Sequence, residues 1–205
     1  ITINIHPLNF KPSQCDLKNL YQKGIIPLHW QLKKSINKNL NSQQFAFEQG
    51  LGMILEKNRV TFVSKPEKMS GEIDFMINNF IRVYLNNNYQ RLQVVIRRLI
   101  SLPGDKNSGS KFLLNHILNP KLSKTKVLGH QPSKTNINIS CDFSPCPLII
   151  TLTDVSIKTK EGKIKSALLF RGVTNSLTRQ KNVLNNYQEY VAFFNKFIED
   201  NFLCY

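Results

Sequence analysis

The chain has 205 residues, 41% of them hydrophobic, and its 28 lysines and arginines against 13 acids give a formal net charge of +15. No apolar run approaches the roughly 18 residues of a membrane span, and the N-terminal stretch lacks the pattern of a signal peptide. Four irregularly spaced cysteines do not fit a secreted disulfide framework. We therefore expect a cytoplasmic protein in which residues 1–205 form one domain.

The first third of the chain predicts an edge strand, an irregular arm and a meander. The stretch "ITINIH" alternates like an edge strand, whereas residues 7–38 contain prolines and show little periodicity. We expect this arm to be packed by its large apolar side chains, Phe10, Leu17, Leu20, Tyr21 and Trp30. The runs "QFAFEQ", "LGMILE" and "RVTFVS" then predict three strands joined by turns at Gly50 and at Lys57-Asn58.

Residues 70–85, "SGEIDFMINNFIRVYL", predict a helix. Ser70 is a suitable N-cap, and Glu72 and Asp74 lie in the first turn, where the helix dipole favours acids. Apolar residues recur with helical spacing and predict one buried face, made of Ile73, Ile77, Phe80, Ile81 and Tyr84.

Residues 90–100 fit either a helix or a strand. The β-branched run "VVI" and the Pro103-Gly104 stop favour a strand. In that strand Leu92, Val94, Ile96 and Ile100 point to one face, and Arg91, Gln93 and Arg97 point to the other.

The rest of the chain predicts a short helix, three strands and a long helix. The short helix covers about 110–118, and the strands are "TNINISCDF", "LIITLTDVSIKTK" and "KIKSALLFRGV", the last two joined by a turn at Glu161-Gly162. The long helix covers about 175–202, with a seam of Leu177, Leu184, Tyr187, Val191, Phe194 and Ile198, widened by Phe193 and Phe197. This order predicts an α+β fold: a largely antiparallel sheet covered by a long C-terminal helix and two shorter helices.

The segment around Gly104 and Gly109 imitates a phosphate-binding P-loop. The two glycines have the required separation, but "GSK" replaces "GKS", so Ser110 and Lys111 are transposed and each points about 100° from its place in the motif. Asp154, at the end of "LIITLTD", could imitate the acid that holds magnesium. Because the pattern lacks alternating βαβ units, we expect no nucleotide hydrolysis. A helix N-terminus at 108–111 that attracts an anion, or an ordinary loop, are the remaining interpretations.

Cysteine and histidine positions give no strong metal or catalytic signal. Cys141 alternates with Ile137 and Ile139 and is expected to be a half-buried strand residue; a zinc site with Cys146 and His130, or a Cys141–Cys146 bridge, are the alternatives. The common hydrolase, metalloprotease and dinucleotide-binding motifs are absent, and the acids are scattered singly. We expect neither a metal nor a cofactor and favour a non-enzymatic protein, although an active site assembled only in space stays open.

The charge distribution indicates a basic surface in the middle of the chain. Ten basic residues and one acid, Asp105, lie between Asp74 and Asp142. The candidate anion-binding residues are Arg91, Arg97, Lys106, Ser108, Gly109, Ser110 and Lys111. Only a quarter of all basic residues are arginine, so codon bias in an AT-rich genome is a competing explanation.

These features favour a binding or accessory module with a basic central surface for an anionic partner, either an acidic protein or a nucleic acid. The alternative is a small-ligand-binding protein with a pocket between the sheet and the C-terminal helix. A phosphate-handling enzyme is the third hypothesis, and it requires Lys111 and an acid to converge beside Gly109.

Two passages resemble a protein family. The first passage contains "ITINIHPLNF" and "QCDLKNLYQKGIIP", and the second is "NRVTFV" with the later "NNNYQ". Both are similar to small conserved proteins of cyanobacteria that have no assigned function. The resemblance covers mainly residues 1–65, and it implies no substrate, cofactor or site residue.

Overall fold

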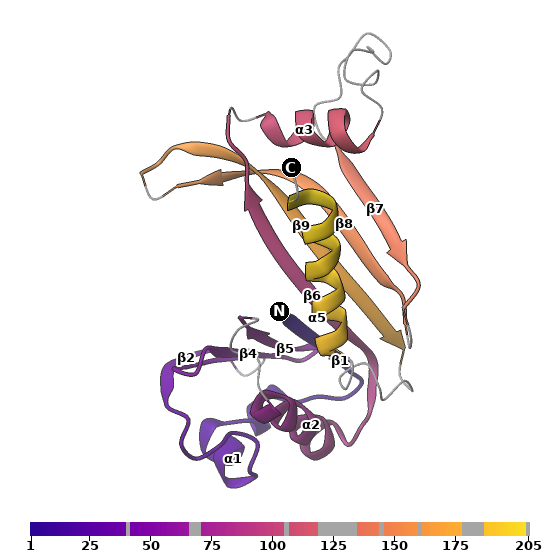
Figure 1. Cartoon of the computed structure of the whole chain (residues 1–205). Coiled ribbons are helices and arrows are strands. Elements are labelled where there is room, and N and C mark those ends of the chain that lie inside the picture. Colours follow the sequence, from indigo (N-terminus) through magenta and orange to yellow (C-terminus); the bar gives the residue numbers. More distant parts are fainter. Residues whose placement is uncertain are drawn as a thin grey trace. The chain divides into compact units, whose positions relative to one another are not determined.

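A computed structural model describes residues 1–39, 42–65, 71–104, 107–118, 135–143, 146–159, 161–177 and 187–203 (Figure 1). The chain divides into two compact units. Unit 1 contains Ile1–Val95, Phe143–Cys146 and Thr174–Tyr205, and unit 2 contains Ile96–Asp142 and Pro147–Val173. Within the described residues, no helix has both the length and the apolar character that a membrane crossing requires.

The strands of unit 1 are β1 (Thr2–Pro7), β2 (Leu32–Asn39), β3 (Ser42–Phe47), β4 (Leu51–Glu56), β5 (Arg59–Ser64) and the first part of β6 (Tyr89–Ser101). Their order is β2-β3-β4-β5-β1-β6, which confirms the predicted meander. The prediction that "ITINIH" is an edge strand is wrong, because β1 pairs with β5 and β6, and Asn4 lies opposite both Thr61 and Gln93. Alternation shows which face of a strand is buried, but it does not reveal the neighbouring strands.

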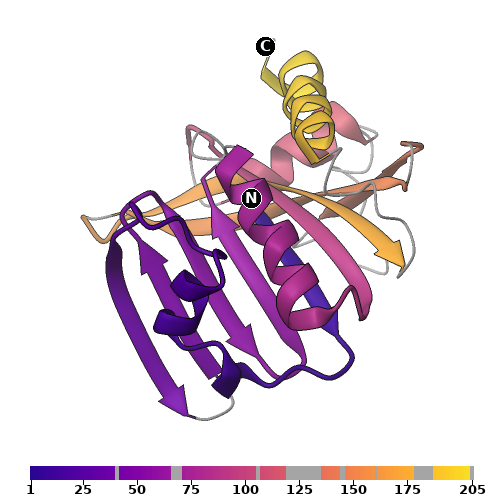
Figure 2. The same cartoon turned by 90° about the horizontal axis from the view of Figure 1, so that it is seen from below.

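One face of this sheet is covered by α1 (Leu17–Gln22) and α2 (Gly71–Leu85), as Figure 2 shows. Phe80 of α2 makes edge contacts with Phe62 and Phe10, at ring-centroid distances of 5.6 and 5.8 Å. Four residues of the predicted face of α2 are buried, Ile73, Ile77, Phe80 and Ile81, whereas Tyr84 is half-buried. The predicted cap, Ser70, lies outside the described residues. These aromatic contacts place the core of unit 1 between the sheet and α2.

The predicted irregular arm is wrong in part, because residues 7–38 contain α1, most of β2 and a 3₁₀ turn, Pro12–Gln14. The α1 helix begins where the side chain of Asp16 accepts a 2.7 Å hydrogen bond from the backbone N–H of Asn19. A cap of this kind stabilises a helix that is too short to show apolar periodicity.

The C-terminal helix α5 (Tyr187–Ile198) continues as a π turn, Glu199–Leu203. Its predicted start at residue 175 is wrong, because Leu177 is the last residue of strand β9 (Ile164–Leu177); the predicted seam residue Leu184 lies outside the described residues. The buried side chains are Tyr187, Tyr190, Phe194 and Ile198. Three of them belong to the predicted seam, whereas Tyr190 was not predicted and the predicted Val191 is half-buried. Within unit 1, Tyr187 Oη donates a 3.2 Å hydrogen bond to Asp74 Oδ2 of α2.

Unit 2 contains the rest of β6, α3 (Ser108–Phe112) with a following π turn (Leu113–Ile117), β7 (Asn136–Cys141), β8 (Leu148–Lys158) and most of β9. Its strand order is β6-β9-β8-β7. The predicted hairpin is confirmed: Gly162, with φ at +83°, donates a 2.9 Å backbone hydrogen bond to Thr159. The α+β class, with an antiparallel sheet and a C-terminal helix, is therefore confirmed.

Candidate functional site

The P-loop-like segment closes on a carboxylate of its own chain. Ser110 Oγ donates a 2.7 Å hydrogen bond to Asp154 Oδ2, and Ser166 Oγ donates at 3.2 Å to Asp154 Oδ1. The backbone N–H of Gly109 donates to Ser166 Oγ at 2.8 Å. The structure thus brings together Gly109, Ser110 and Asp154, but as a hydrogen-bonded cluster around one carboxylate.

Gly109 is required in this cluster because of the close approach of Asp154. A Cβ atom at Gly109 would collide with Oδ1 of Asp154 and would lie 3.0 Å from Ser166 Oγ. The serines are also enclosed, since Ser110 is 7% exposed and Ser166 is fully buried. The neighbouring Lys111 is exposed, and Lys106 lies outside the described residues. The close approach of Asp154 therefore explains why position 109 is a glycine, without a bound phosphate.

Arg97 of β6 lies opposite Arg171 of β9, within unit 2. The backbone N–H of Leu102 donates a 3.0 Å hydrogen bond to the carbonyl of Ser166, which fixes the register of the two strands. Arg97 is five residues before Leu102, and Arg171 is five residues after Ser166 on the antiparallel strand β9. The two arginines are therefore placed side by side on one face of the sheet. Burial, followed by the nearby charge of Arg171, lowers the pKa of Arg97. Two like charges are thus held close together.

Arg91, within unit 1, belongs to a second basic group. It lies opposite His6 of β1, and its Nη2 is 3.3 Å from His6 Nε2. Burial and the charges of Arg91 and Arg59 lower the pKa of His6, and a hydrogen bond that its imidazole donates to the backbone of Asn58 raises it by less. These side chains share the face of the sheet that bears the half-buried Asn4, which is opposite to the face packed under α2. We name that face, which bears the exposed Val63 and the buried Thr61 and Val95, the open face of the unit 1 sheet.

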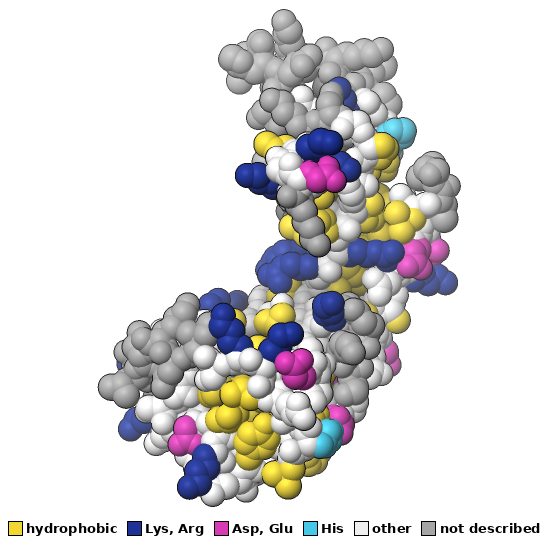
Figure 3. All heavy atoms as spheres, turned by 90° about the vertical axis from the view of Figure 1, so that its left-hand side faces the viewer, with side chains coloured by type: hydrophobic (Ala, Val, Ile, Leu, Met, Phe, Trp, Pro, Cys, Tyr) yellow, Lys and Arg dark blue, Asp and Glu magenta, His cyan; other side chains and the backbone are white. Residues whose placement is uncertain are grey.

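The sequence singled out Arg91 and Arg97 but missed their partners His6, Arg59 and Arg171. The available signal was alternation: His6 shares a face with Asn4, and Arg171 shares a face with Leu169. Without the strand order, no sequence pattern pairs these residues. On the molecular face drawn in Figure 3, Lys and Arg side chains are more frequent than acidic ones.

The described cysteines are free thiols, so the alternative of a Cys141–Cys146 bridge is wrong. Cys141 is half-buried in β7, as expected from its alternation. Burial of Cys15 raises the pKa of its thiol to about 12, which keeps it protonated and unreactive. Among the described residues no cluster of His, Cys, Asp or Glu could hold a metal ion; His130, of the zinc alternative, lies outside them.

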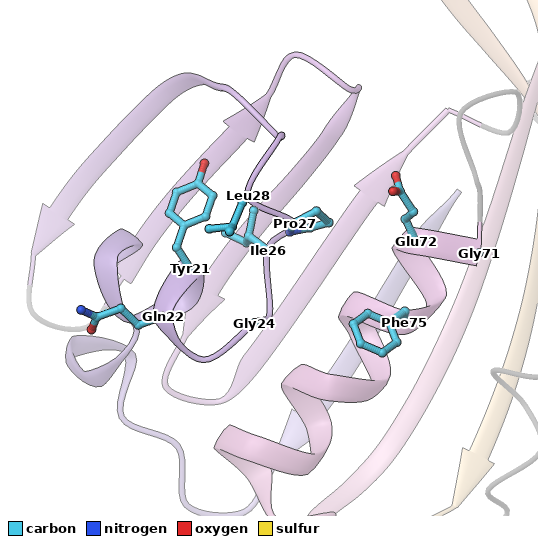
Figure 4. Close-up of a pocket in the computed structure, with 9 residues that line it drawn as sticks. All are labelled: Tyr21, Gln22, Gly24, Ile26, Pro27, Leu28, Gly71, Glu72 and Phe75. Carbon is cyan, nitrogen blue, oxygen red and sulfur yellow. The ribbon is translucent and has the colours of Figure 1, made fainter.

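A pocket of about 570 Å³ lies in unit 1 between α1, the loop that follows it and the first turns of α2 (Figure 4). Its nine lining residues are Tyr21, Gln22, Gly24, Ile26, Pro27, Leu28, Gly71, Glu72 and Phe75. Two hydrogen bonds join the lining residues Tyr21 and Glu72 to Trp30. Tyr21 Oη donates at 2.7 Å to the carbonyl of Trp30, and Trp30 Nε1 donates at 3.3 Å to Glu72 Oε2. The pocket is therefore in a different place from the one expected at the C-terminal helix.

Comparison with known proteins gives no family for this chain. No protein-family model matches it, and no curated protein matches it at a significant level. The resemblance to cyanobacterial proteins stays a prediction.

Proposed function

We propose that the protein is a non-enzymatic binding module in which Arg97 and Arg171 of unit 2, together with the open face of the unit 1 sheet, engage the phosphate backbone of a nucleic acid. The observation that carries this proposal is the cross-strand pair of Arg97 and Arg171. A guanidinium presents a planar fork that matches phosphate oxygens, and an anion between two such groups offsets their repulsion.

The charge of unit 2 supports an anionic partner. The unit contains 13 lysines and arginines against 4 acids. One of those acids, Asp154, already accepts hydrogen bonds from Ser110 and Ser166. A surface with this imbalance attracts polyanions over a distance of about one Debye length, roughly 10 Å at 0.1 M salt.

His6, Arg91 and Arg59 extend the same chemistry to unit 1. Arg59 is held by Glu56 through hydrogen bonds of 2.9 and 3.1 Å, so part of its charge is neutralised locally. Arg91 faces His6, whose lowered pKa favours the neutral imidazole at pH 7. Arg91 is therefore the principal cation of this group at neutral pH.

No catalytic step is part of this proposal. The two serines that donate to Asp154, Ser110 and Ser166, are buried, so a substrate has poor access to their hydroxyls. We propose a cytoplasmic setting, because the free thiols of Cys15, Cys141 and Cys146 suit a reducing compartment.

The class of partner is tested by comparing polyanions over a salt series. We expect a labelled DNA duplex to bind at about 50 mM salt and, with about six phosphate contacts, to lose roughly a thousandfold in affinity by 200 mM. A polyglutamate peptide of equal charge is expected to bind more weakly, because single carboxylates bridge a pair of guanidiniums less well than phosphate does. Tighter binding of polyglutamate than of DNA would favour an acidic protein partner, and no binding of either would refute the proposal.

A further inference from the structure

We propose that the pocket between α1 and α2 is a binding site for an organic cation, an ammonium or guanidinium group carried on an apolar stem, with Glu72 as its counter-ion. This site is independent of the basic sheet faces and takes a ligand of the opposite charge. It lies entirely within unit 1.

The size and lining of the pocket suit a small organic molecule. Its volume of about 570 Å³ falls within the roughly 300–1,000 Å³ typical of ligand sites. Ile26, Pro27, Leu28 and Phe75 supply apolar contact surface, and Glu72 is the one charged residue among the nine that line it. An apolar cavity with a single charge predicts a ligand with an apolar body and one opposite charge.

The carboxylate of Glu72 is held in place by the loop that follows α1. Trp30 Nε1 donates to Oε2 at 3.3 Å, and His29 Nε2 lies 3.4 Å from Oε1. The Tyr21 hydroxyl fixes the same loop through the carbonyl of Trp30. An ionised carboxylate accepts about four hydrogen bonds, so two neighbours leave it acceptor capacity for a ligand.

Two aromatic side chains and an exposed leucine complete the site. Figure 4 shows Tyr21 on α1 and Phe75 on α2, with Leu28 on the loop between them. Phe75 is 59% exposed and Leu28 is 86% exposed, so large apolar surfaces face water at the pocket. An apolar stem would cover these surfaces, and aromatic ring faces attract a cation that lies within about 6 Å.

The start of α2 does not make this an anion site. Gly71 is the first residue of α2, so the positive end of the helix dipole lies near the pocket. Glu72 and Asp74 both lie in the first turn and offset that partial charge. A bound anion would therefore meet a full negative charge at Glu72, which selects against it.

The tryptophan beside Glu72 is the only one in the chain, so its fluorescence reports on this site. Titration with hexylammonium, hexanol and hexanoate compares a cation, a neutral molecule and an anion with the same stem. We expect saturable changes in Trp30 emission with hexylammonium, and affinities at least about tenfold lower for the other two. Equal or tighter binding of hexanoate or hexanol would overturn the proposal.

Variants separate the site from general effects. Glu72→Gln keeps the shape of the side chain and is expected to lower the affinity for hexylammonium about tenfold. Calorimetry measures this affinity independently of any change that the substitution makes in Trp30 emission. The matched control is Glu48→Gln, another exposed glutamate of unit 1, which should leave the affinity unchanged. Unchanged affinity in Glu72→Gln, or an equal loss in the control, would refute the assignment of Glu72. Binding of DNA by Glu72→Gln should stay at the wild-type level.

Discussion

Ser110 donates a 2.7 Å hydrogen bond to Asp154, so the helix start that imitates a P-loop is joined to a carboxylate of the same chain. In a P-loop the corresponding backbone and hydroxyl groups bind phosphate and magnesium. Here the backbone N–H of Gly109 donates to Ser166 and the hydroxyl of Ser110 donates to Asp154, so both groups already have partners within the chain, and the carboxylate would repel a phosphate bound beside it.

The first prediction is that the protein neither binds nor hydrolyses ATP or GTP. The Asp154 carboxylate and the antiparallel pairing of β6 with β1 are the physical reasons. Calorimetry with magnesium and ATP should show no micromolar binding. Tight binding that is abolished by Lys111→Ala would contradict this prediction and would restore the P-loop interpretation.

The second prediction concerns Gly109. Replacing it with alanine places a methyl group against Asp154 and should lower the free energy of unfolding by about 2 kcal/mol, as overpacking does elsewhere. The matched control is Gly71→Ala, because a Cβ at Gly71 meets no atom within 4 Å. Denaturant melts should therefore show a loss for the first variant and little change for the second. Equal stabilities would mean that the cluster relaxes without cost.

The third prediction concerns Phe194, which is fully buried on α5. Truncation to alanine should lower the free energy of unfolding by roughly 3–5 kcal/mol, because it leaves a cavity in a packed core. The exposed Lys196 of the same helix offers a control, since Lys196→Ala removes no buried contact. A change below about 1 kcal/mol in Phe194→Ala would show that α5 contributes little to the core.

The fourth prediction is a pH dependence that comes from Asp74. Burial raises the pKa of Asp74 by more than the hydrogen bond from Tyr187 lowers it. A folded-state pKa above the unfolded value means that the folded state binds the proton more tightly. The stability that Asp74 contributes is therefore fully present below about pH 4 and is lost as the pH rises through the folded pKa.

The difference in unfolding free energy between the wild type and Asp74→Asn isolates this effect from the other carboxylates. It should shift in favour of the variant as the pH rises from below about 4 through the folded-state pKa of Asp74, and then stay constant. Tyr187→Phe removes the donor that lowers the pKa of Asp74, so in that background the shift should extend to higher pH. A difference that does not change with pH would contradict the burial of this carboxylate.

Local patterns were sufficient to predict the strands of the meander, the β8–β9 hairpin and α2. Their alternation, turn residues and apolar spacing are properties of short stretches of sequence. The position of β1 between β5 and β6 depends on pairing over long sequence distances, which local alternation does not encode. The α1 helix was missed because six residues show no periodicity, although Asp16 was a readable cap.

The candidate sites could be predicted only in part for the same reason. The strand interpretation of β6 is confirmed and Leu92, Val94 and Ile96 are buried as predicted, but Val95 on the opposite face is buried too and Ile100 is half-buried. The opposition of Arg97 and Arg171 depends on the register between two distant strands. The pocket at Glu72 likewise combines α1 and the loop that follows it with α2, which is distant in sequence.

The central claim is that Arg91, Arg97 and Arg171 bind a polyanion. The most direct test is the binding of duplex DNA by the triple variant Arg91→Gln, Arg97→Gln, Arg171→Gln. The control replaces three exposed lysines of unit 1, Lys11, Lys18 and Lys196, with glutamine. The arginine variant should bind more weakly, with a salt slope flatter by about three contacts. Equal weakening by both variants would show that the charge acts diffusely and would contradict the account.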